Sequence, residues 1–184
     1  MSTILWRRID CPGHETACIE SLDPGYRLSG TAVFLHETRP CGLNYSVDCD
    51  AAWRTVAATV RGRVGSRTID ISISFSPNGD WMLNGFPVPS VAGCVDLDLN
   101  FSPSTNTLPI RRLGLDVGAS ASVSAAWLRF PDFRFERLDQ VYSRLADRTY
   151  RYQSHDGKFA AELAVNEYGL VTNYAGLWQA EVAG

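Results

Sequence analysis

The chain has 184 residues, of which 45% are hydrophobic and 20% charged, and its formal net charge at pH 7 is -3. These values predict one globular domain, residues 1–184, that buries roughly 70% of the surface exposed in the unfolded chain. The acidic balance argues against a nucleic-acid partner. No run approaches the roughly 20 apolar residues of a membrane-spanning helix, so we expect no integral membrane segment.

The first ten residues lack the apolar core of a signal peptide, and the chain contains five cysteines. An odd cysteine count without an export signal predicts reduced thiols and a cytoplasmic location. Cys11, His14 and Cys18 lie close together, but a structural zinc site takes four ligands in two tight pairs. Because no second close pair follows, we expect neither a metal site nor a cofactor. Nothing in the sequence indicates an oligomeric state.

Alternation of apolar and polar residues, the period of a β-strand, recurs along the whole chain. It is clearest at 67–75, where Ile69, Ile71 and Ile73 share one face. In chain order, the predicted strands are 26–35, 45–50, 53–61, 67–75, a short one at Trp81, then 95–101, 122–130, 134–142, 149–154, 159–165 and 170–178. These segments are rich in β-branched and aromatic residues, as strands are.

Turn residues separate the predicted strands. The turn signals are Gly62 with Gly65, Asn78-Gly79, Asn84-Gly85 and Asp156-Gly157. Asn-Gly and Asp-Gly pairs favour the positive φ angles that tight hairpins need. One segment, 138–146, also repeats apolar residues at helical spacing, so that strand and helix are equally favoured there.

A dozen or more short strands joined by hairpins should pair antiparallel with their chain neighbours. So many strands cannot stay flat, because sheets twist and long open sheets curl. We therefore expect an all-β domain with at most one short helix, built as a closed barrel, a rolled sheet or a sandwich.

The stretch 93–113 has the most unusual pattern in the chain, G-C-V-D-L-D-L-N-F-S-P-S-T-N-T-L-P-I-R-R-L. Asp96 and Asp98 share the polar face of a strand, a polar loop with two prolines follows at 102–109, and Arg111 and Arg112 come next. Two interpretations are open. The charges form either a solvated face with weak surface ion pairs, or a pocket mouth that binds hydroxyls or an anionic headgroup. The loop is equally a simple connector or a polar lip of that pocket.

The aromatic content bears on whether the sheet encloses a cavity. The chain has five tryptophans, seven tyrosines and eight phenylalanines. Tryptophan and tyrosine combine a stacking face with a polar group, which suits sugar rings and lipid headgroups. The strand count also exceeds the roughly eight whose side chains fill a barrel interior. Both observations favour a cavity lined by mixed residues.

Signals for catalysis are few. The chain has neither a G-x-S-x-G nucleophile motif nor a phosphate-binding glycine loop, and we assign no catalytic residue. Asp96 and Asp98 lie on one strand face and could act as acid and base on a glycoside. A hydrolase acting on a sugar-containing or acylated small molecule is therefore an alternative function, and a scaffold or assembly domain is another.

The stretch 93–113 resembles the signature of a bacterial family described as "putative glycolipid-binding", formerly a domain of unknown function. Similar segments are 45–50 with 53–55, 80–81 with 84–85, and 150–152. The resemblance covers nearly the whole chain and implies a many-stranded antiparallel sheet rolled in a spiral. The family has been likened in shape to periplasmic lipoprotein-localisation factors, which hold acyl chains in a half-barrel. The missing export signal departs from that carrier role and leaves the fold unaffected.

The leading prediction is a non-enzymatic protein that binds a glycolipid or another acylated amphipathic small molecule. Its acyl chain would pack against aliphatic and aromatic side chains, at about 0.8 kcal/mol per buried methylene. The candidate ligand-binding residues are Tyr45, Trp53, Arg54, Trp81, Asp96, Asp98, Asn106, Arg111 and Arg112.

Overall fold

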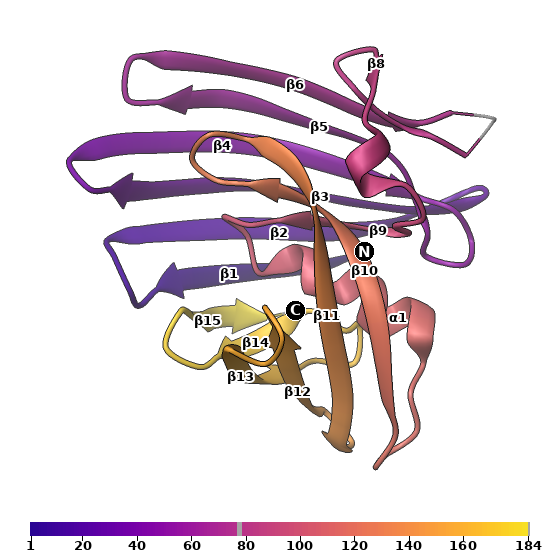
Figure 1. The fold of residues 1–184 in the computed structure, drawn as a ribbon. Helices are drawn as coiled ribbons and strands as arrows, with labels where there is room; N and C mark the ends of the chain where they lie inside the picture. The colour runs from indigo at the N-terminus through magenta and orange to yellow at the C-terminus, as the bar shows by residue number, and fades with distance from the viewer. Residues whose placement is uncertain (77–78, 184) are drawn as a thin grey trace.

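The fold was analysed in a computed structural model that describes residues 1–76 and 79–183 (Figure 1). These residues form a single sheet of fifteen strands. The strands are β1 (Ser2–Arg8), β2 (Gly13–Leu22), β3 (Gly25–His36), β4 (Arg39–Cys49), β5 (Thr55–Val64), β6 (Arg67–Phe75), β7 (Trp81–Leu83), β8 (Phe86–Pro87), β9 (Asp96–Leu99), β10 (Ser120–Arg129), β11 (Arg134–Ala146), β12 (Thr149–Ser154), β13 (Phe159–Val165), β14 (Val171–Tyr174) and β15 (Trp178–Ala183). The helical elements are η1 (Pro89–Val91), η2 (Ser104–Asn106) and α1 (Thr107–Leu113).

The strand order explains why the sheet curls. It runs from β8 back to β1, then from β15 back to β9, so β8 and β9 occupy the two outer edges. In a flat sheet, fourteen intervals of about 4.8 Å would separate these edges by roughly 67 Å. The chain joins them with residues 88–95 alone, which can span at most roughly 32 Å. The sheet must therefore roll until its edges approach each other, as Figure 1 shows.

The first and last strands pair in the middle of the sheet. β1 is antiparallel to β15, and every other neighbouring pair is antiparallel except β9 and β10, which are parallel. Figure 1 shows β1 to β6 as one curved wall, with β10 and β11 crossing steeply in front of it. The helical segment that contains α1 lies between these two parts.

Buried aromatic side chains hold the rolled sheet together. Trp6 on β1 is fully buried, and its indole N–H donates to the carbonyl of Val171 on β14. Trp81 on β7 donates to the carbonyl of Cys94 at 2.9 Å and meets the ring of Phe135 on β11 edge to face. The Trp6 contact joins strands two places apart in the sheet order, whereas the Trp81 ring joins β7 near one edge to β11 near the other, so the core belongs to the roll as a whole.

The predicted fold class is confirmed: the described residues form an all-β, curled but unclosed sheet with one short α-helix. The structure contains the strands 67–75, 149–154 and 159–165 with the predicted bounds. Segment 138–146 lies in β11, which decides for strand over helix. The sequence did not reveal β1 and β2.

Two predicted elements were wrong. Segment 170–178 is not one strand but parts of β14 and β15, because Gly176 adopts a φ of 79° in a turn between them. The predicted loop 102–109 is largely helical, since it contains η2 and the start of α1. Pro109 is compatible with α1 because it lies in the first turn, where a missing backbone N–H leaves no hydrogen bond unmade.

Several predicted turns show the expected backbone. Asn84 and Gly85 adopt φ angles of 51° and 83° between β7 and β8, and Asp156 and Gly157 adopt 55° and 79° in the β12–β13 hairpin. Gly65 (φ 58°) lies in the turn after β5, whereas Gly62 lies within that strand. Asn78 of the predicted Asn78-Gly79 turn is outside the described residues.

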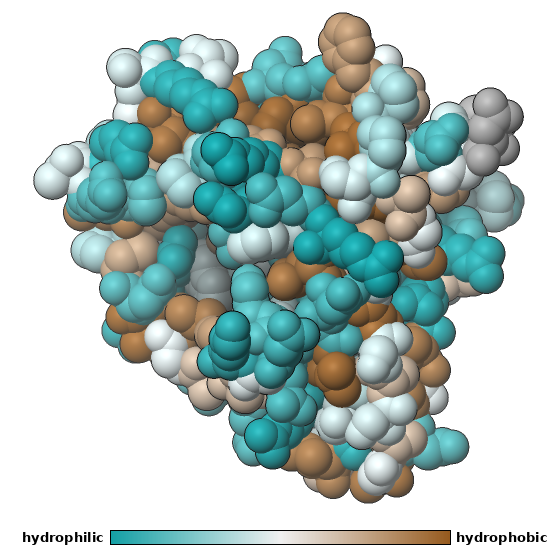
Figure 2. Space-filling view, in the orientation of Figure 1, coloured by the Kyte–Doolittle hydropathy of each residue, from teal (hydrophilic) through white to brown (hydrophobic). Residues whose placement is uncertain are grey.

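Figure 2 shows hydrophilic side chains across much of this face, with apolar side chains at both ends, including the end that carries β6 and β8. Among the large apolar side chains exposed at this end of the sheet are Val56 on β5, Phe75 on β6 and Phe86 on β8. Within the described residues, no helix has the length and hydrophobicity to cross a bilayer.

One glycine allows two strands to be bridged by a side chain. Gly30 on β3 faces Tyr45 on β4, and a Cβ at this position would lie 2.5 Å from Cζ of the Tyr45 ring. The absence of a side chain therefore lets the Tyr45 ring cross β3 towards β2. We predict that Gly30→Ala lowers the free energy of unfolding by about 1–3 kcal/mol through overpacking, measured by urea denaturation.

Gly42, on the neighbouring strand β4, is the matched control. A Cβ built there meets nothing within 4 Å, so Gly42→Ala should leave stability unchanged or slightly higher. Equal stabilities for the two variants would contradict the proposed role of Gly30.

Candidate functional site

The segment after β9 fills the interior of the roll. Every residue from 101 to 110 is buried, although most are polar or proline. Hydroxyl groups satisfy the backbone here: Thr105 accepts from the Leu99 N–H at 3.1 Å, and Thr107 donates to the Gly169 carbonyl at 3.0 Å. The short polar side chains of this segment thus replace a sheet ladder as hydrogen-bond partners.

A cavity of about 180 Å³ lies between this segment and the C-terminal strands; we call it the aromatic cavity. Its aromatic side chains are Trp127, Tyr152, Phe159, Tyr174 and Trp178. Tyr152 contacts the rings of both Phe159 and Tyr174, with centroid distances of 5.9 and 6.2 Å. Three strands therefore contribute to one continuous aromatic wall.

Asp98 supplies the negative charge of the aromatic cavity. Its Oδ2 accepts a hydrogen bond from Nε2 of Gln140 at 2.6 Å, and the same amide nitrogen donates to the Tyr152 hydroxyl at 3.1 Å. Burial raises the pKa of Asp98 to about 6. No described residue hydrogen-bonds to Oδ1, so this oxygen is available to a ligand.

Other polar groups surround Asp98 in fixed orientations. Asn106 accepts from the Tyr142 hydroxyl at 2.9 Å and donates to the Pro103 carbonyl at 3.0 Å, which fixes its amide and leaves one N–H unused. His155 lies at the hairpin after β12, with Nδ1 3.0 Å from the Ser154 hydroxyl and its ring edge on to Trp127. The cavity thus combines aromatic faces with a carboxylate, an amide and an imidazole.

A second cavity of about 280 Å³ adjoins the first and shares Asn100, Leu177 and Trp178 with it. Its other walls include the rings of Phe34, Phe101 and Phe130. The Arg8 guanidinium lies over the rings of Phe34 and Trp178, at 4.7 and 4.9 Å from their centroids. Asp10 pairs with Arg8 through two hydrogen bonds of 3.0 and 2.7 Å. The recess therefore continues from the aromatic cavity into a part that is lined by three phenylalanine rings and by the charged side chains of Arg8, Asp10 and Glu37.

A buried carboxyl group supports the floor of the aromatic cavity. Ser102, which lines the cavity, donates to Oε1 of Glu15, and the Tyr45 hydroxyl donates to the same oxygen at 2.6 Å. Glu15 is 1% exposed, and Oε2 has no hydrogen-bond partner among the described residues. Burial raises the pKa of Glu15 to about 8, so this group is mostly protonated at neutral pH.

The second aspartate of the strand has a different role. Asp96 is 1% exposed and makes a bidentate pair with Arg112, with distances of 2.9 Å from Nε to Oδ1 and 2.6 Å from Nη2 to Oδ2. This pair fastens α1 to β9. Both Asp96 oxygens are thereby occupied, whereas Asp98 retains a free one.

Four further candidate residues lie elsewhere. Arg111 stacks over Trp53, 5.3 Å from the ring centroid, and Trp53 in turn stacks on Tyr26. Trp81 is a core residue, and Arg54 lies on the rim of a separate cavity. Of the nine predicted residues, the structure brings Asp98 and Asn106 together in the aromatic cavity. Tyr45 lies behind that cavity in the Glu15 network.

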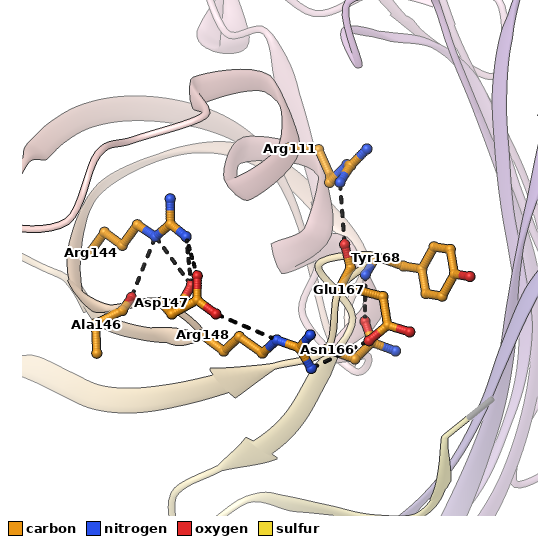
Figure 3. A network of polar contacts seen from close by, with 8 residues as sticks. All are labelled: Arg111, Arg144, Ala146, Asp147, Arg148, Asn166, Glu167 and Tyr168. Carbon is orange, nitrogen blue, oxygen red and sulfur yellow. Dashed lines mark hydrogen bonds and ion pairs between the residues drawn. The ribbon is translucent and has the colours of Figure 1, made fainter.

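Figure 3 shows the polar network near Arg111, which borders another cavity of about 330 Å³. Arg144 donates to the backbone carbonyls of Leu115, Ala146 and Asp147 at 2.7, 3.4 and 2.6 Å. Arg148 lies within 3.8 Å of the Asp147 carboxylate and 3.3 Å of the Glu167 carboxylate. Most of these guanidinium donors are engaged within the protein, so the network stabilises the turn after β11.

Sequence reasoning missed most of the aromatic cavity. The sequence analysis used the aromatic residues of the cavity only as part of the aromatic composition; these are Trp127, Tyr152, Tyr174 and Trp178. No sequence pattern pointed to Gln140 or Glu15 as part of a site. Tyr152 lies within the segment 150–152 that carries the family resemblance, which was the one available indication.

The described residues contain no candidate metal site, and their cysteines form no disulfide. No three His, Cys, Asp or Glu side chains among them lie close enough to hold a metal ion. All five cysteines are free thiols.

Comparison with known proteins identifies the family. The model of the family described as "Putative glycolipid-binding" matches residues 3–180. The chain belongs to this family. It is also similar to the crystal structure of a DUF1089 family protein from Pseudomonas aeruginosa, at 31% identity over 90% of this chain and 91% of the other, with a TM-score of 0.79. A search of curated proteins found no match.

The Glu15 network predicts a pH-dependent stability. Because the pKa of Glu15 is about 8 in the folded protein and near 4.5 as a free group, folding favours the protonated form. The stabilisation is complete below about pH 4.5 and is lost as the pH rises towards about 8. We expect the free energy of unfolding to decrease between about pH 6 and pH 8 in wild type, and to change much less in Glu15→Gln.

Asp98→Asn serves as the comparison in the same urea-denaturation series. The pKa of Asp98 is also raised, to about 6. Its contribution to the free energy of unfolding therefore also decreases as the pH rises, but this decrease is complete at a lower pH than that of Glu15. If Glu15→Gln kept the full wild-type slope above about pH 6, Glu15 would not be the group responsible.

The Asp96–Arg112 pair predicts a large loss of stability when one partner is removed. Arg112→Ala leaves a buried carboxylate without its cation, which costs about 3–5 kcal/mol. Arg111, the preceding residue of the same helix, is exposed. Arg111→Ala removes its cation–π contact with Trp53 and should lower the free energy of unfolding by about 1 kcal/mol or less. Adding Asp96→Asn to Arg112→Ala should recover part of the loss. Equal unfolding midpoints for the two arginine variants in urea would refute this role.

Proposed function

We propose that this protein binds a glycolipid or a related sugar-containing amphipathic molecule without chemically converting it. The observation that carries the proposal is the aromatic cavity, in which the free Oδ1 of Asp98 lies among five aromatic side chains. Aromatic faces stack on the apolar faces of sugar rings, while carboxylate and amide groups bind the hydroxyls. The family description, "Putative glycolipid-binding", agrees with this chemistry.

The sizes of the two adjoining cavities suggest that different parts of one ligand occupy them. The aromatic cavity, at about 180 Å³, is smaller than the roughly 300–1,000 Å³ of sites for drug-sized ligands, so it suits one ring-sized group. The second cavity offers apolar surface on the rings of Phe34, Phe101 and Phe130, beside polar and charged side chains. We propose that a sugar occupies the first cavity and that the adjoining apolar part of the ligand occupies the second. In this proposal residues 1–184 act as one domain.

The carboxylate arrangement favours binding over hydrolysis. Glycoside hydrolysis ordinarily uses two carboxyl groups that flank the scissile bond. Asp98 is the only carboxylate lining the aromatic cavity in the described part of the chain. Asp96, its proposed partner in the hydrolase alternative, is occupied by Arg112.

Octyl β-glucoside is a suitable first probe, titrated calorimetrically below its micelle concentration beside octyl galactoside and octanol. We predict that wild type binds an alkyl glycoside more tightly than octanol and that Asp98→Asn weakens this binding about tenfold, because a charged hydrogen-bond acceptor is lost. The affinity of wild type should also fall as the pH drops through about 6, where Asp98 becomes protonated.

Asp70→Asn is the matched control, since Asp70 is an exposed carboxylate on β6 whose ion-pair partner is Arg61. It should bind like wild type at every pH. Indifference of wild type to all alkyl glycosides, or unchanged affinity in Asp98→Asn, would refute the placement of the sugar in the aromatic cavity.

A further inference from the structure

A third cavity, of about 380 Å³, lies where the rolled sheet meets itself. The start of β5 contacts β9 and the residue before it: the Thr55 N–H donates to the Val95 carbonyl at 3.3 Å, and the Thr55 hydroxyl accepts from the Leu97 N–H at 3.1 Å. We call this the seam cavity. Its lining comes from the turn before β5, from β5 itself, from the end of β6, from the segment before β9 and from α1.

The wall of the seam cavity is largely apolar and open to solvent. Val56 and Phe75, which line it, are 47% and 38% exposed, and Val95 continues the same wall. Phe75 is held in place edge to face against the buried Trp81 ring. A ligand that covered these side chains would remove apolar surface from water, which is favourable in proportion to the area.

The rim of the seam cavity carries two guanidinium groups with unused donors. No described residue forms an ion pair or a side-chain hydrogen bond with the Arg54 guanidinium, whose residue is exposed. Arg112 directs Nε and Nη2 at Asp96, and its Nη1 has no hydrogen-bond partner in the described part of the chain.

One carboxylate, Asp50, also lies on this rim. Its Oδ1 is engaged in the turn before β5, where it accepts from the backbone N–H groups of Ala52 and Arg54 at 2.9 Å each. The unused hydrogen-bond donors at the rim therefore belong to cations, and they match a ligand with an anionic end.

We propose that the seam cavity is a second binding site, for a single alkyl chain that ends in a carboxylate. The chain lies along Val56, Phe75 and Val95, and the carboxylate accepts hydrogen bonds from Arg54 and from Nη1 of Arg112. This site is separate from the aromatic cavity and goes beyond the function proposed above. Its volume falls within the range of sites that hold small organic ligands.

The test uses dodecanoate labelled with ¹³C at the carboxyl carbon, below its micelle concentration, with dodecanol as the uncharged comparison. Calorimetry gives the affinity, and the ¹³C shift against pH reports whether the bound carboxylate stays ionised beside a guanidinium. Wild type should bind dodecanoate more tightly than dodecanol. Arg54→Gln should weaken dodecanoate about tenfold, raise the pKa of the bound carboxyl group and leave dodecanol unchanged.

A further pair of variants and a control variant sharpen the test. Val56→Glu places a carboxylate in the cavity, and Val56→Gln is its uncharged counterpart, so dodecanoate should bind Val56→Glu more weakly than Val56→Gln. Arg7→Gln removes a guanidinium from β1 that is 59% exposed, and it should bind like wild type. Equal binding of dodecanoate and dodecanol, or wild-type affinity in Arg54→Gln, would overturn the proposal.

The two proposals can fail separately. Binding of octyl glucoside should be unaffected by Arg54→Gln, and binding of dodecanoate should be unaffected by Asp98→Asn. Loss of both ligands in one folded variant would show that they share a site, and would overturn the assignment of a separate seam site.

Discussion

The short connection between β8 and β9 is the constraint on which this structure depends. Residues 88–95 join strands at opposite edges of a fifteen-stranded sheet, so the sheet has to roll until these edges lie near each other. The edges do not pair as a closed barrel would, and instead meet through isolated hydrogen bonds, such as those from the Trp81 indole to the Cys94 carbonyl and from the Thr55 N–H to the Val95 carbonyl. An unclosed roll has a wide interior, which the helical segment after β9 occupies only in part. The cavities lie where that filling ends.

The interior segment has to be polar, because its backbone is not paired in the sheet. Each short side chain there satisfies a specific group, and Glu15 satisfies two hydroxyls with one oxygen. Raising the pKa of Glu15 is the cost of placing a carboxyl group in this position. The result is a floor of fixed hydroxyl groups beneath the aromatic cavity, with Ser102 belonging to both the network and the cavity lining. Stability and ligand contact therefore depend on the same few residues.

Local patterns determined what could be predicted. Alternation in 67–75 reports directly on which face is buried, and the same holds for 149–154, so these strands were predictable. The strand order depends on contacts between distant segments, such as β1 with β15, which no local pattern encodes. The helix α1 was hidden because Thr107 and Pro109 in its first turn are residue types typical of loops in water, whereas burial makes the hydrogen bond from the Thr107 hydroxyl to a backbone carbonyl worthwhile. Gln140 joins the site through Asp98 and Tyr152, which are 42 and 12 residues away along the chain.

Asp96 and Asp98 show why the site itself was only half predictable. The sequence places both carboxylates on one face of one strand, which is where β9 has them. Their roles differ because of what arrives from elsewhere in the fold: Arg112 of α1 occupies both oxygens of Asp96, whereas a neutral amide from β11 occupies one oxygen of Asp98. A carboxylate neutralised by a buried cation is a structural element, and removing its partner is costly. A carboxylate held by an amide keeps its charge uncompensated, and its open oxygen can bind hydroxyl groups. The two acids are chemically the same. Asp96 holds a helix and Asp98 is available to a ligand because, within the described residues, only Asp96 is paired with a cation, Arg112.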